Sequence, residues 1–467
     1  MKLHCFERRA FVCFSAIFLC LQCLPWQLTA FEQFPLGILG GRGEVTAGSN
    51  LLKLVALHEK SPAAEAGLQT GDRISGIDGV TFKPHSNNID DGGSGPQRAL
   101  GEALDDVASR KQDDQRTILL NVVRGEGEQE LVIRCLLPHR AGVLDQKGRA
   151  QLLERAAQHL RKTQRPAGHW DAPVGLTGDR VLTAWAAIAL KSLDEQQDEE
   201  RLKKSAAWLL GPNDRAWIPE ELTKKGPDNL GNWALTATAI ALVECSNAKP
   251  DAKQKVALEL ICQALQERMD DGGRFGHDVI TGYSGKGFNV INTLTHLAWT
   301  MGEQVEVSID KAKWKLSFDQ INQSVDSNGG IRYWTLKNTG TGDASLRTSS
   351  MALALAISKR NSELVATLSN YLDKHRSRTR EAHAVGSMGM LLTPAALWRH
   401  DREAYHRFLN EWRWYLSLMQ DNQGTLHYIG GKRNNGGDSY LGMDRMACAI
   451  AIMILSPPDE KLVLYKN

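Results

Sequence analysis

The sequence predicts a two-domain protein, in which a small α+β domain is followed by a larger all-α domain shaped as an (α/α)6 toroid. Residues 34–138 alternate strand-like segments with one amphipathic helix. Residues 151–460 contain six copies of a turn, a polar loop and an apolar helix, with charge-rich amphipathic helices between them. A repeat of this length indicates stacked units that share one core. An open solenoid of helix pairs is the alternative, because periodicity alone does not show closure.

The chain begins with a targeting segment. Lys2, Arg8 and Arg9 precede an apolar run at residues 10–24, and a small residue, Ala30, ends an acceptable cleavage site. The apolar run is short for a membrane span of about 20 residues. We therefore expect residues 1–30 to be a signal peptide and the protein to be exported to the periplasm or the extracellular space. No membrane span is expected after cleavage; an uncleaved anchor is the alternative.

The net charge and the spacing of the cysteines argue against a nucleic-acid-binding protein and against a zinc-knuckle protein. The net charge of the 467 residues is +2, and acids and bases are interspersed, so a basic surface for nucleic acid is not expected. The cysteines outside the targeting segment are widely spaced and form no Cys-x-x-Cys pair, which disfavours zinc knuckles. The sequence leaves open a disulfide between Cys245 and Cys262.

Within the first domain, residues 51–57 are strand-like. A short helical turn follows at Pro62, and Asp78-Gly79 makes a tight hairpin turn. Residues 96–110 have apolar positions at helical spacing. The segments "TILLNVVR" and "QELVIRCLL" then form two closing strands.

The stretch "SPAAEAGLQTGDRISGIDG" resembles the PDZ domains of bacterial envelope proteases and secretion factors. In that family, backbone amides before the second strand hold the C-terminal carboxylate of a peptide, which adds to the sheet edge. The resemblance implies that Leu36, Gly37 and Ile38 form this cradle and that Arg98 lies near its entrance, with protein or peptide C-termini as partners. The insert at residues 83–96 departs from the family pattern. A module that only packs against its neighbour is the alternative.

The second domain follows a linker at residues 139–150, which includes the start of the first outer helix. The six repeats begin at Pro166, Arg215, Asp270, Ser327, Glu381 and Asn422. We expect their aromatic or histidine positions to be equivalent: Trp170, Trp217, Phe275, Tyr333, His383 and Tyr428. The small-residue helices should line the inside of a ring, and the charge-rich helices should face solvent.

The turns "DDGGRFG" and "SNGGIRYW" resemble the GG-F/W turns of terpenoid cyclases and protein prenyltransferases. The resemblance implies a helical toroid, and it extends to secreted bacterial proteins of the same architecture. The chemistry of those families does not carry over. The toroid region lacks an Asp-x-Asp-Asp cluster, and no cysteine outside the targeting segment has an aspartate two residues before it. We therefore expect no cofactor and no metal.

The loops before the inner helices should line one mouth of the toroid. The expected mouth residues are His169, Trp170, Tyr283, Asn289, Asn292, Tyr333, Arg347, His383, His427, Tyr428, Asp444 and Arg445. Histidines transfer protons near neutral pH and carboxylates orient them. The candidates for catalysis are His277, Asp278, Asp171, Asp343 and Asp438. Packing is the alternative role for His383 and His427, and Asp444 with Arg445 is expected as an ion pair that closes the ring.

The sequence thus predicts an exported protein that binds peptide C-termini through its first domain. A small molecule or glycan is the expected ligand of the toroid mouth. The alternative is a carbohydrate-active or other enzyme with its active site in the toroid cavity.

Overall fold

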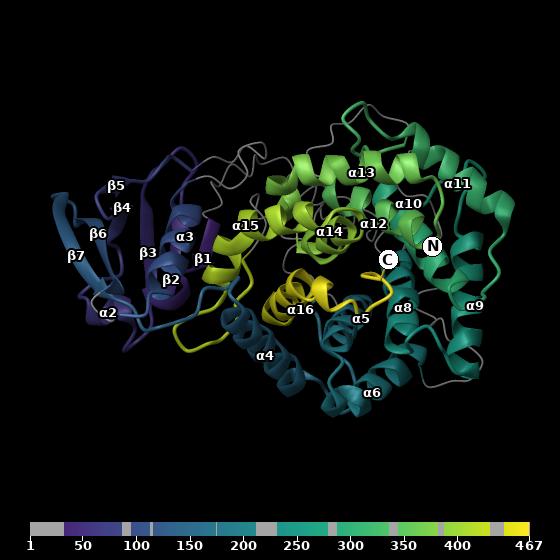
Figure 1. Cartoon of the computed structure of the whole chain (residues 1–467), viewed down its shortest axis with the longest axis horizontal. Helices are drawn as coiled ribbons and strands as arrows, with labels where there is room; N and C mark the ends of the chain where they lie inside the picture. Colours follow the sequence, from purple (N-terminus) through teal and green to yellow (C-terminus); the bar gives the residue numbers. More distant parts are fainter. Residues whose placement is uncertain are drawn as a thin grey trace, which may run out of the picture.

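The computed structural model describes residues 32–85, 95–112, 115–173, 175–211, 231–278, 287–335, 344–381, 387–429 and 443–466. The expected signal peptide lies outside the described residues. A small antiparallel sheet is followed by a helical domain, and the two lie side by side along the long axis (Figure 1). The predicted order of a sheet-containing domain and a helical domain is confirmed.

The sheet is antiparallel at every pairing between its described strands. Its order along the main path is β1 (Glu32–Pro35), β2 (Gly41–Val45), β3 (Leu52–Leu57), β4 (Arg73–Ile77), β6 (Thr117–Arg124) and β7 (Gln129–Leu136), with β5 (Val80–Thr81) paired to β4. Alternate residues such as Leu52, Leu54 and Ile118 are fully buried, as expected for a sheet with one covered face.

Two helices and a short 3-10 turn accompany the sheet: α2 (Pro62–Glu65), α3 (Pro96–Ala108) and η1 (Gly37–Leu39). Ser61 caps α2, because its side chain accepts a hydrogen bond from the backbone N–H of Ala64. The amphipathic pattern predicted for residues 96–110 is present in α3, which buries Leu100, Leu104 and Val107.

Six described helices form the inner wall of the second domain: α5 (Leu176–Leu193), α8 (Gly231–Cys245), α10 (Asn289–Glu303), α12 (Ser345–Ile357), α14 (Ser387–His400) and α16 (Met443–Leu455). Each contacts the next one, and α16 contacts α5 (Figure 1). The helices therefore form a closed ring rather than an open stack. α5 and α8 are buried on nearly every side, which their many alanines permit because small side chains let helices approach closely.

In the described part of the domain, the outer layer consists of six amphipathic helices: α4 (Gln146–Thr163), α6 (Glu199–Leu210), α9 (Ala252–Glu267), α11 (Lys311–Gln323), α13 (Ser362–Lys374) and α15 (Arg402–Met419). Asp251, Asp310, Asn361 and Asp401 cap four of them through their side chains. Each outer helix packs on the inner helix before it, and α4 packs on α16. The first and last helices of the domain thus join the ring.

The turns before three inner helices share one geometry. Gly273, Gly329 and Gly424 have φ of 80°, 89° and 85°, a backbone region that favours glycine. The residue two positions later is buried in each case: Phe275, Ile331 and Leu426. At Gly273, an added Cβ would also lie 2.7 Å from the carbonyl oxygen of Leu316.

The positions that fill these turns differ in part from the predicted ones. The backbone N–H groups of Trp170, Phe275 and Ile331 donate to a side-chain oxygen of an inner helix, at 3.0, 2.9 and 3.2 Å. Tyr333 and Tyr428 were predicted as their equivalents. In their own turns, however, the buried position two residues after the glycine is taken by Ile331 and Leu426, and each tyrosine lies two residues further along the chain. The prediction aligned aromatic residues, whereas the turn selects a position relative to its glycine. Trp217 and His383 lie outside the described residues.

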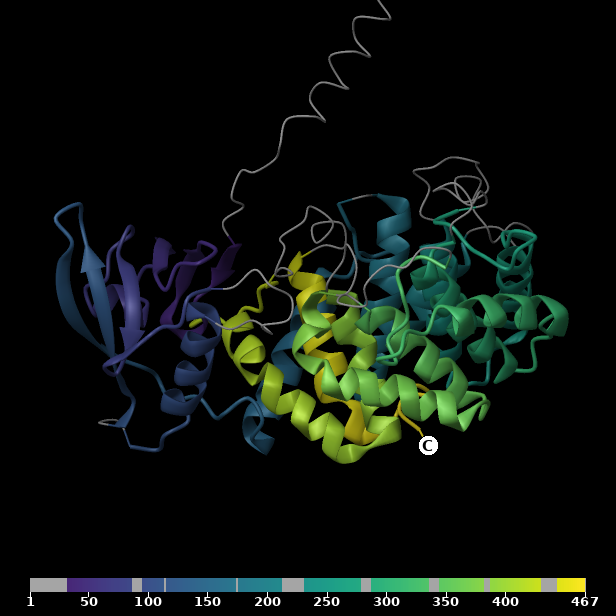
Figure 2. The ribbon, with the colours of Figure 1, turned by 90° about the horizontal axis from the view of Figure 1, so that it is seen from above.

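The two domains meet through α15, which packs against α3 and η1 (Figure 2). The Cβ that Gly101 lacks would lie 2.6 Å from the carbonyl oxygen of Trp414, so only glycine permits this approach. Arg98 Nη1 donates to Glu411 Oε1 at 2.5 Å, and Arg413 Nη1 donates to Asp106 Oδ1 at 2.5 Å.

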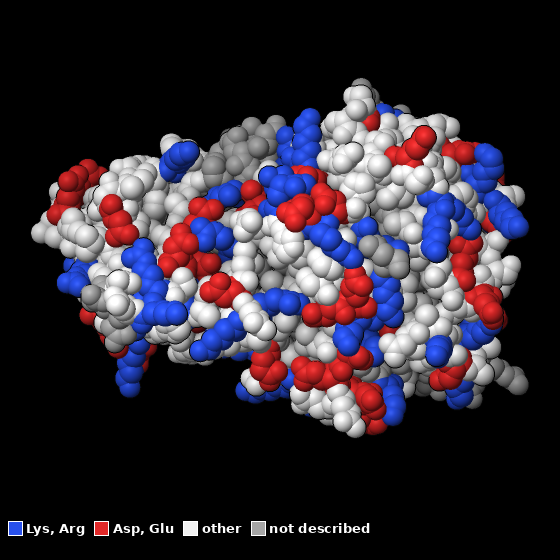
Figure 3. Space-filling view, viewed as in Figure 1, with Lys and Arg blue, Asp and Glu red and all other residues white. Residues whose placement is uncertain are grey.

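Within the described residues, every helix is too short or too polar to cross a membrane. The thiols of Cys245 and Cys262 are both free, so the disulfide that the sequence left open is not formed. On the face shown in Figure 3, Lys and Arg are interspersed with Asp and Glu, and no extended area carries a single sign.

Candidate functional site at the ring closure

The turn before α16 places a charged histidine at the point where the ring closes. His427 Nε2 lies 2.8 Å from Asp421 Oδ2, and its Nδ1 lies 3.7 Å from Asp444 Oδ1. The hydrogen bonds to these two carboxylates raise the pKa of His427 to about 9, although burial opposes the shift. The imidazole is therefore a cation at neutral pH.

Asp421 is fixed by its own turn. Its Oδ1 accepts hydrogen bonds from the backbone N–H groups of Gln423 and Thr425, at 2.9 and 2.8 Å. Burial alone would raise the pKa of Asp421, but the hydrogen bonds from His427 and the backbone outweigh it, so the pKa is lowered. The carboxylate stays ionised and holds the imidazolium in one orientation.

A second histidine faces the same region from α4. Burial lowers the pKa of His159 below its ordinary value, and the nearby carboxylate of Asp444 only partly opposes this. At neutral pH, His159 is therefore uncharged while His427 carries a positive charge. A cavity of about 460 Å³ lies here; its lining comprises His159, Thr163, Asp171, Ala172, Pro173, Asp444 and Arg445. The cavity combines groups of both charges with a neutral imidazole.

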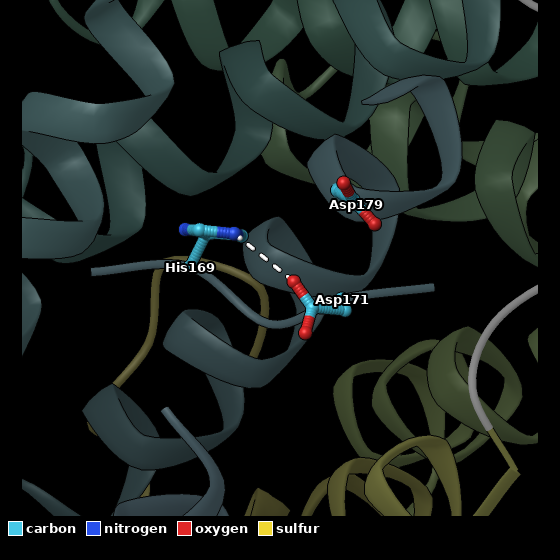
Figure 4. A group of neighbouring side chains, drawn as sticks. All are labelled: His169, Asp171 and Asp179. Atoms are coloured by element: carbon cyan, nitrogen blue, oxygen red, sulfur yellow. Dashed lines mark hydrogen bonds and ion pairs between the residues drawn. The ribbon is translucent and has the colours of Figure 1, made fainter. Parts of the chain in front are cut away.

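A third group of polar residues borders this cavity at the start of α5. His169 and Asp171 point toward each other, with 3.1 Å between Nε2 and Oδ1 (Figure 4). Asp179, on the first turn of α5, accepts a hydrogen bond from the backbone N–H of Ala172 at 2.5 Å. The ligating atoms of His169, Asp171 and Asp179 all lie within 4.8 Å of one another.

Neighbouring arginines orient Asp171. Arg165 Nε donates to Asp171 Oδ2 at 2.5 Å, which lowers the pKa of this carboxyl. Arg445 Nη1 donates to the backbone carbonyl of Asp171. The ion pair predicted between Asp444 and Arg445 is therefore replaced by two separate contacts: Asp444 with His427, and Arg445 with the Asp171 backbone.

His277 and Asp278 each contact a different neighbouring side chain. Asp278 is 2% exposed and forms an ion pair with Arg268, with 2.5 Å between Arg268 Nη1 and Oδ1. His277 Nδ1 accepts a hydrogen bond from Trp233 Nε1 at 2.8 Å, and burial lowers the pKa of His277 to about 4. Both residues join neighbouring repeats, away from the ring closure.

Asn289 and Asn292 are buried and hold loops in place. Asn289 Nδ2 donates to the carbonyl of Arg332 at 2.8 Å, and its Oδ1 accepts from Thr335 Oγ1 at 2.9 Å. Asn292 Oδ1 accepts the backbone N–H of Phe275 at 2.9 Å. Asn292 therefore links the turn before α10 to α10, and Asn289 links α10 to the segment that precedes α12.

The remaining expected mouth residues have packing roles or lie elsewhere. Trp170 is fully buried, and its Nε1 donates to the carbonyl of Leu160 at 2.9 Å. The guanidinium of the buried Arg347 lies 5.2 Å from the ring centre of Tyr333, and Tyr428 is also buried. Four of the predicted residues lie outside the described residues: Tyr283, Asp343, His383 and Asp438.

The expected peptide cradle is covered within the chain. Leu36, Gly37 and Ile38 are buried, and the Cβ that Gly37 lacks would lie 3.1 Å from the carbonyl oxygen of Ser417 in α15. The Leu36 amide already donates to Gly41, and β1 pairs with β2 on the edge where a peptide strand would add. The sheet domain also has a groove of about 620 Å³ beside α3. Two of its charged lining residues, Arg98 and Glu102, pair with each other.

Residues 150–465 match the model of a family described as "Domain of unknown function (DUF6288)". This match spans more than half of the chain.

The chain belongs to the DUF6288 family.

The DUF6288 match begins within α4 and extends beyond α16, so it covers the ring and leaves out the sheet domain. No curated protein matches the chain. Among solved structures, a type II terpene cyclase from Scytonema without ligand is 14% identical, covers 67% of this chain and 99% of its own, and gives a TM-score of 0.42. A variant of it in complex with geranylgeranyl dihydroxybenzoate is 13% identical, with 66% and 98% covered and a TM-score of 0.42. These TM-scores are low. The conclusion that the inner helices close into a ring depends only on the contacts between helices within this chain.

Three site residues were not singled out from the sequence: His159, Arg165 and Asp421. His159 lies on an outer helix, where a polar residue normally faces solvent. Its spacing from Thr163 places both on one helix face, but only the contact between α4 and α16 shows that this face borders a cavity.

Proposed function

We propose that the protein binds a small polar ligand in the cavity at the ring closure. The observation that carries this proposal is the lining of the cavity, in which Asp444, Arg445 and the neutral His159 surround a volume of about 460 Å³. The size is within the range of small-molecule sites. Groups of both charges favour a ligand with several hydrogen-bond donors and acceptors.

Carbohydrates fit this description better than apolar molecules do. The hydroxyl groups of a sugar can donate a hydrogen bond to Asp444 and accept one from Arg445, because each hydroxyl is both a donor and an acceptor. The charged His427 holds Asp444 ionised, because the hydrogen bond and charge of the imidazolium lower the pKa of that carboxyl against the effect of burial. An ionised Asp444 is then a permanent acceptor for a hydroxyl group.

The test is a calorimetric binding screen of the full chain against monosaccharides and short oligosaccharides. Arg445→Gln should weaken binding of any hit by about tenfold or more, because a hydrogen bond to a charged group contributes about 1.5–3 kcal/mol. Glu306→Gln is the matched control, since Glu306 is exposed and pairs only with Lys255 among the described residues. Equal binding by Arg445→Gln and the control would reject the cavity as the site.

An enzymatic role for the same cavity is the second candidate. The observation that favours it is the pair of histidines whose environments move their pKa values apart, down for His159 and up to about 9 for His427. A neutral base and a charged acid at one pH suit general acid–base catalysis. On this hypothesis His159→Gln lowers kcat by about 100-fold or more, while ligand affinity changes little. A kcat that is unaffected would exclude it.

We also propose that the protein works in the periplasm or outside the cell, because residues 1–30 have the charge and hydropathy pattern of a signal peptide. Cell fractionation with mass measurement of the N-terminus tests this. A cytoplasmic chain that retains residues 1–30 would oppose the proposal.

The sheet domain resembles PDZ domains, and we propose that Leu36, Gly37 and Ile38 take a peptide C-terminus only in a state in which α15 has left η1. Support comes from the burial of this loop under Ser417 and Leu418. An array of C-terminal peptides should give no signal with the full chain unless the contact with α15 is weakened.

A further inference from the structure

We infer that His169, Asp171 and Asp179 bind one divalent transition-metal cation, such as Zn²⁺. The inference deepens the proposed function, because Asp171 also lines the cavity at the ring closure. Metal binding itself needs no organic ligand, so the two can be tested separately.

The geometry of the three side chains suits a shared cation. Their ligating atoms lie within 4.8 Å of one another, and they come from one loop and the first turn of α5 (Figure 4). Zinc binds imidazole nitrogen and carboxylate oxygen at about 2.0–2.2 Å, so neighbouring ligands of one ion lie about 3–4 Å apart. Small side-chain rotations therefore suffice to bring all three to one ion.

The donor set indicates the class of metal. One imidazole nitrogen with two carboxylate oxygens suits borderline cations such as Zn²⁺ or Co²⁺ better than Ca²⁺, which prefers oxygen alone. Three protein ligands leave a coordination position open for water or a ligand atom, as in catalytic zinc sites. The open position would let the cation hold an oxygen of a ligand in the adjoining cavity.

The surrounding contacts already fix each side chain. The imidazole of His169 stacks on Trp208 with 4.6 Å between ring centres, and its Nδ1 is enclosed, so Nε2 is the nitrogen that can reach a ligand. Arg165 holds Oδ2 of Asp171, which leaves Oδ1 directed at His169. Outer contacts of this kind orient metal ligands and reduce the entropy lost on binding.

Asp179 supplies the second carboxylate. Its Oδ1 accepts the Ala172 amide, whereas no described group donates to its Oδ2. Burial raises the pKa of Asp179, with the Asp171 charge adding to the rise and the Ala172 hydrogen bond opposing it. A bound cation would offset the cost of placing two carboxylates together.

The test uses the metal alone on the full chain after treatment with EDTA. Isothermal titration with Zn²⁺ should show one equivalent bound, and Co²⁺ should give visible absorption bands typical of nitrogen and oxygen ligands. His169→Gln and Asp179→Asn should each weaken binding by at least about 100-fold, since even loss of an outer contact costs about 10- to 100-fold. The controls change residues of the same types: His400→Gln at an exposed position and Asp319→Asn at a partly exposed one that pairs with Lys315.

Three results would overturn the inference: no saturable equivalent of metal, full affinity in both variants, or a Co²⁺–thiolate charge-transfer band that places the ion at a cysteine. Circular dichroism without metal checks that each variant is folded. If one variant does not fold, the other decides. A chain that binds Zn²⁺ but no sugar would contradict the ligand proposal and leave the metal site supported.

Discussion

At the residue scale, the charge of His427 depends on two carboxylates that lie on different elements. Asp421 belongs to the turn, and Asp444 belongs to the first turn of α16. The charge of His427 in turn acts on His159, from α4, and helps to lower its pKa. The sequence places His427 only six residues from Asp421, so this contact could be anticipated, whereas the contacts with α4 and α16 depend on ring closure.

A pH prediction follows from the raised pKa of His427. The folded pKa is about 9 and the ordinary value is 6.5, so the charged imidazole stabilises the fold fully below pH 6.5 and loses this effect as the pH rises to about 9. The side chain is 24% exposed, so we expect roughly 1–3 kcal/mol rather than the full value of the shift. Urea unfolding should show that His427→Gln is less stable than the wild type at pH 6.5, and that the difference shrinks by pH 9. A difference that stays constant over this range would contradict it.

Other residue assignments show where sequence reasoning ended. Asn289 and Asn292 were expected to need partners inside the ring. Both atoms of the Asn289 amide have one, whereas Asn292 has a partner for Oδ1 and none among the described residues for its buried Nδ2. His277 and Asp278 were both named among the candidates for catalysis. Each instead has its own partner, Trp233 for the imidazole and Arg268 for the carboxylate. Adjacency in a loop does not fix the directions of two side chains, so this part could not be derived from spacing.

At the element scale, the spacing of apolar residues predicted the inner and outer helices well. A helix buried on all sides is apolar all round, whereas a helix buried on one face has apolar residues on that face and polar residues on the other. The equivalent positions in the turns were harder. Ile331 and Leu426 fill the places that Trp170 and Phe275 fill elsewhere, so the residue type changes while the distance from Gly329 or Gly424 stays fixed. The distance from the turn glycine therefore identifies the equivalent buried position better than the presence of an aromatic residue does.

The C-terminal segment after α16 is held by one buried carboxylate of α8. Glu244 accepts the backbone N–H groups of Val463 and Leu464 at 2.7 and 2.8 Å, and burial raises its pKa to about 7 despite these bonds. Glu244→Ala leaves two amides without their acceptor, which should cost about 2–4 kcal/mol of unfolding free energy. Hydrogen exchange should also accelerate at residues 462–466. Glu306→Ala serves as the exposed control, and unchanged exchange in Glu244→Ala would show that the segment is held by other contacts.

At the scale of the whole molecule, the sequence predicted two domains but not how they meet. The resemblance to PDZ domains placed a ligand site at η1 and Arg98, whereas the chain covers η1 with α15 and pairs Arg98 with Glu411. The Arg98–Glu411 contact joins segments more than 300 residues apart in the sequence, so it cannot be predicted from local sequence patterns. The first domain therefore does pack against its neighbour, and peptide binding by it stays a prediction.

The docking of the two domains depends on the absence of a side chain at Gly101. A Cβ there would lie 2.6 Å from the Trp414 carbonyl, and backbone cannot move away as a flexible side chain can. We expect Gly101→Val to separate α15 from α3, because the bulky side chain would overlap the helix backbone. Small-angle scattering should then show a larger radius of gyration, and the peptide array should gain signal as η1 is uncovered.

Gly127→Ala is the matched control, since no atom lies within 4 Å of the position that its methyl group would take and its φ is not positive. A second test of the same interface exchanges the charges of Arg98 and Glu411. Arg98→Glu alone places two carboxylates together and should weaken docking, whereas Arg98→Glu combined with Glu411→Arg should restore compactness. If Gly101→Val scatters like the wild type, the two domains are held together by contacts other than α15 with α3. If it opens without peptide binding, docking rather than peptide capture is the role of the sheet domain.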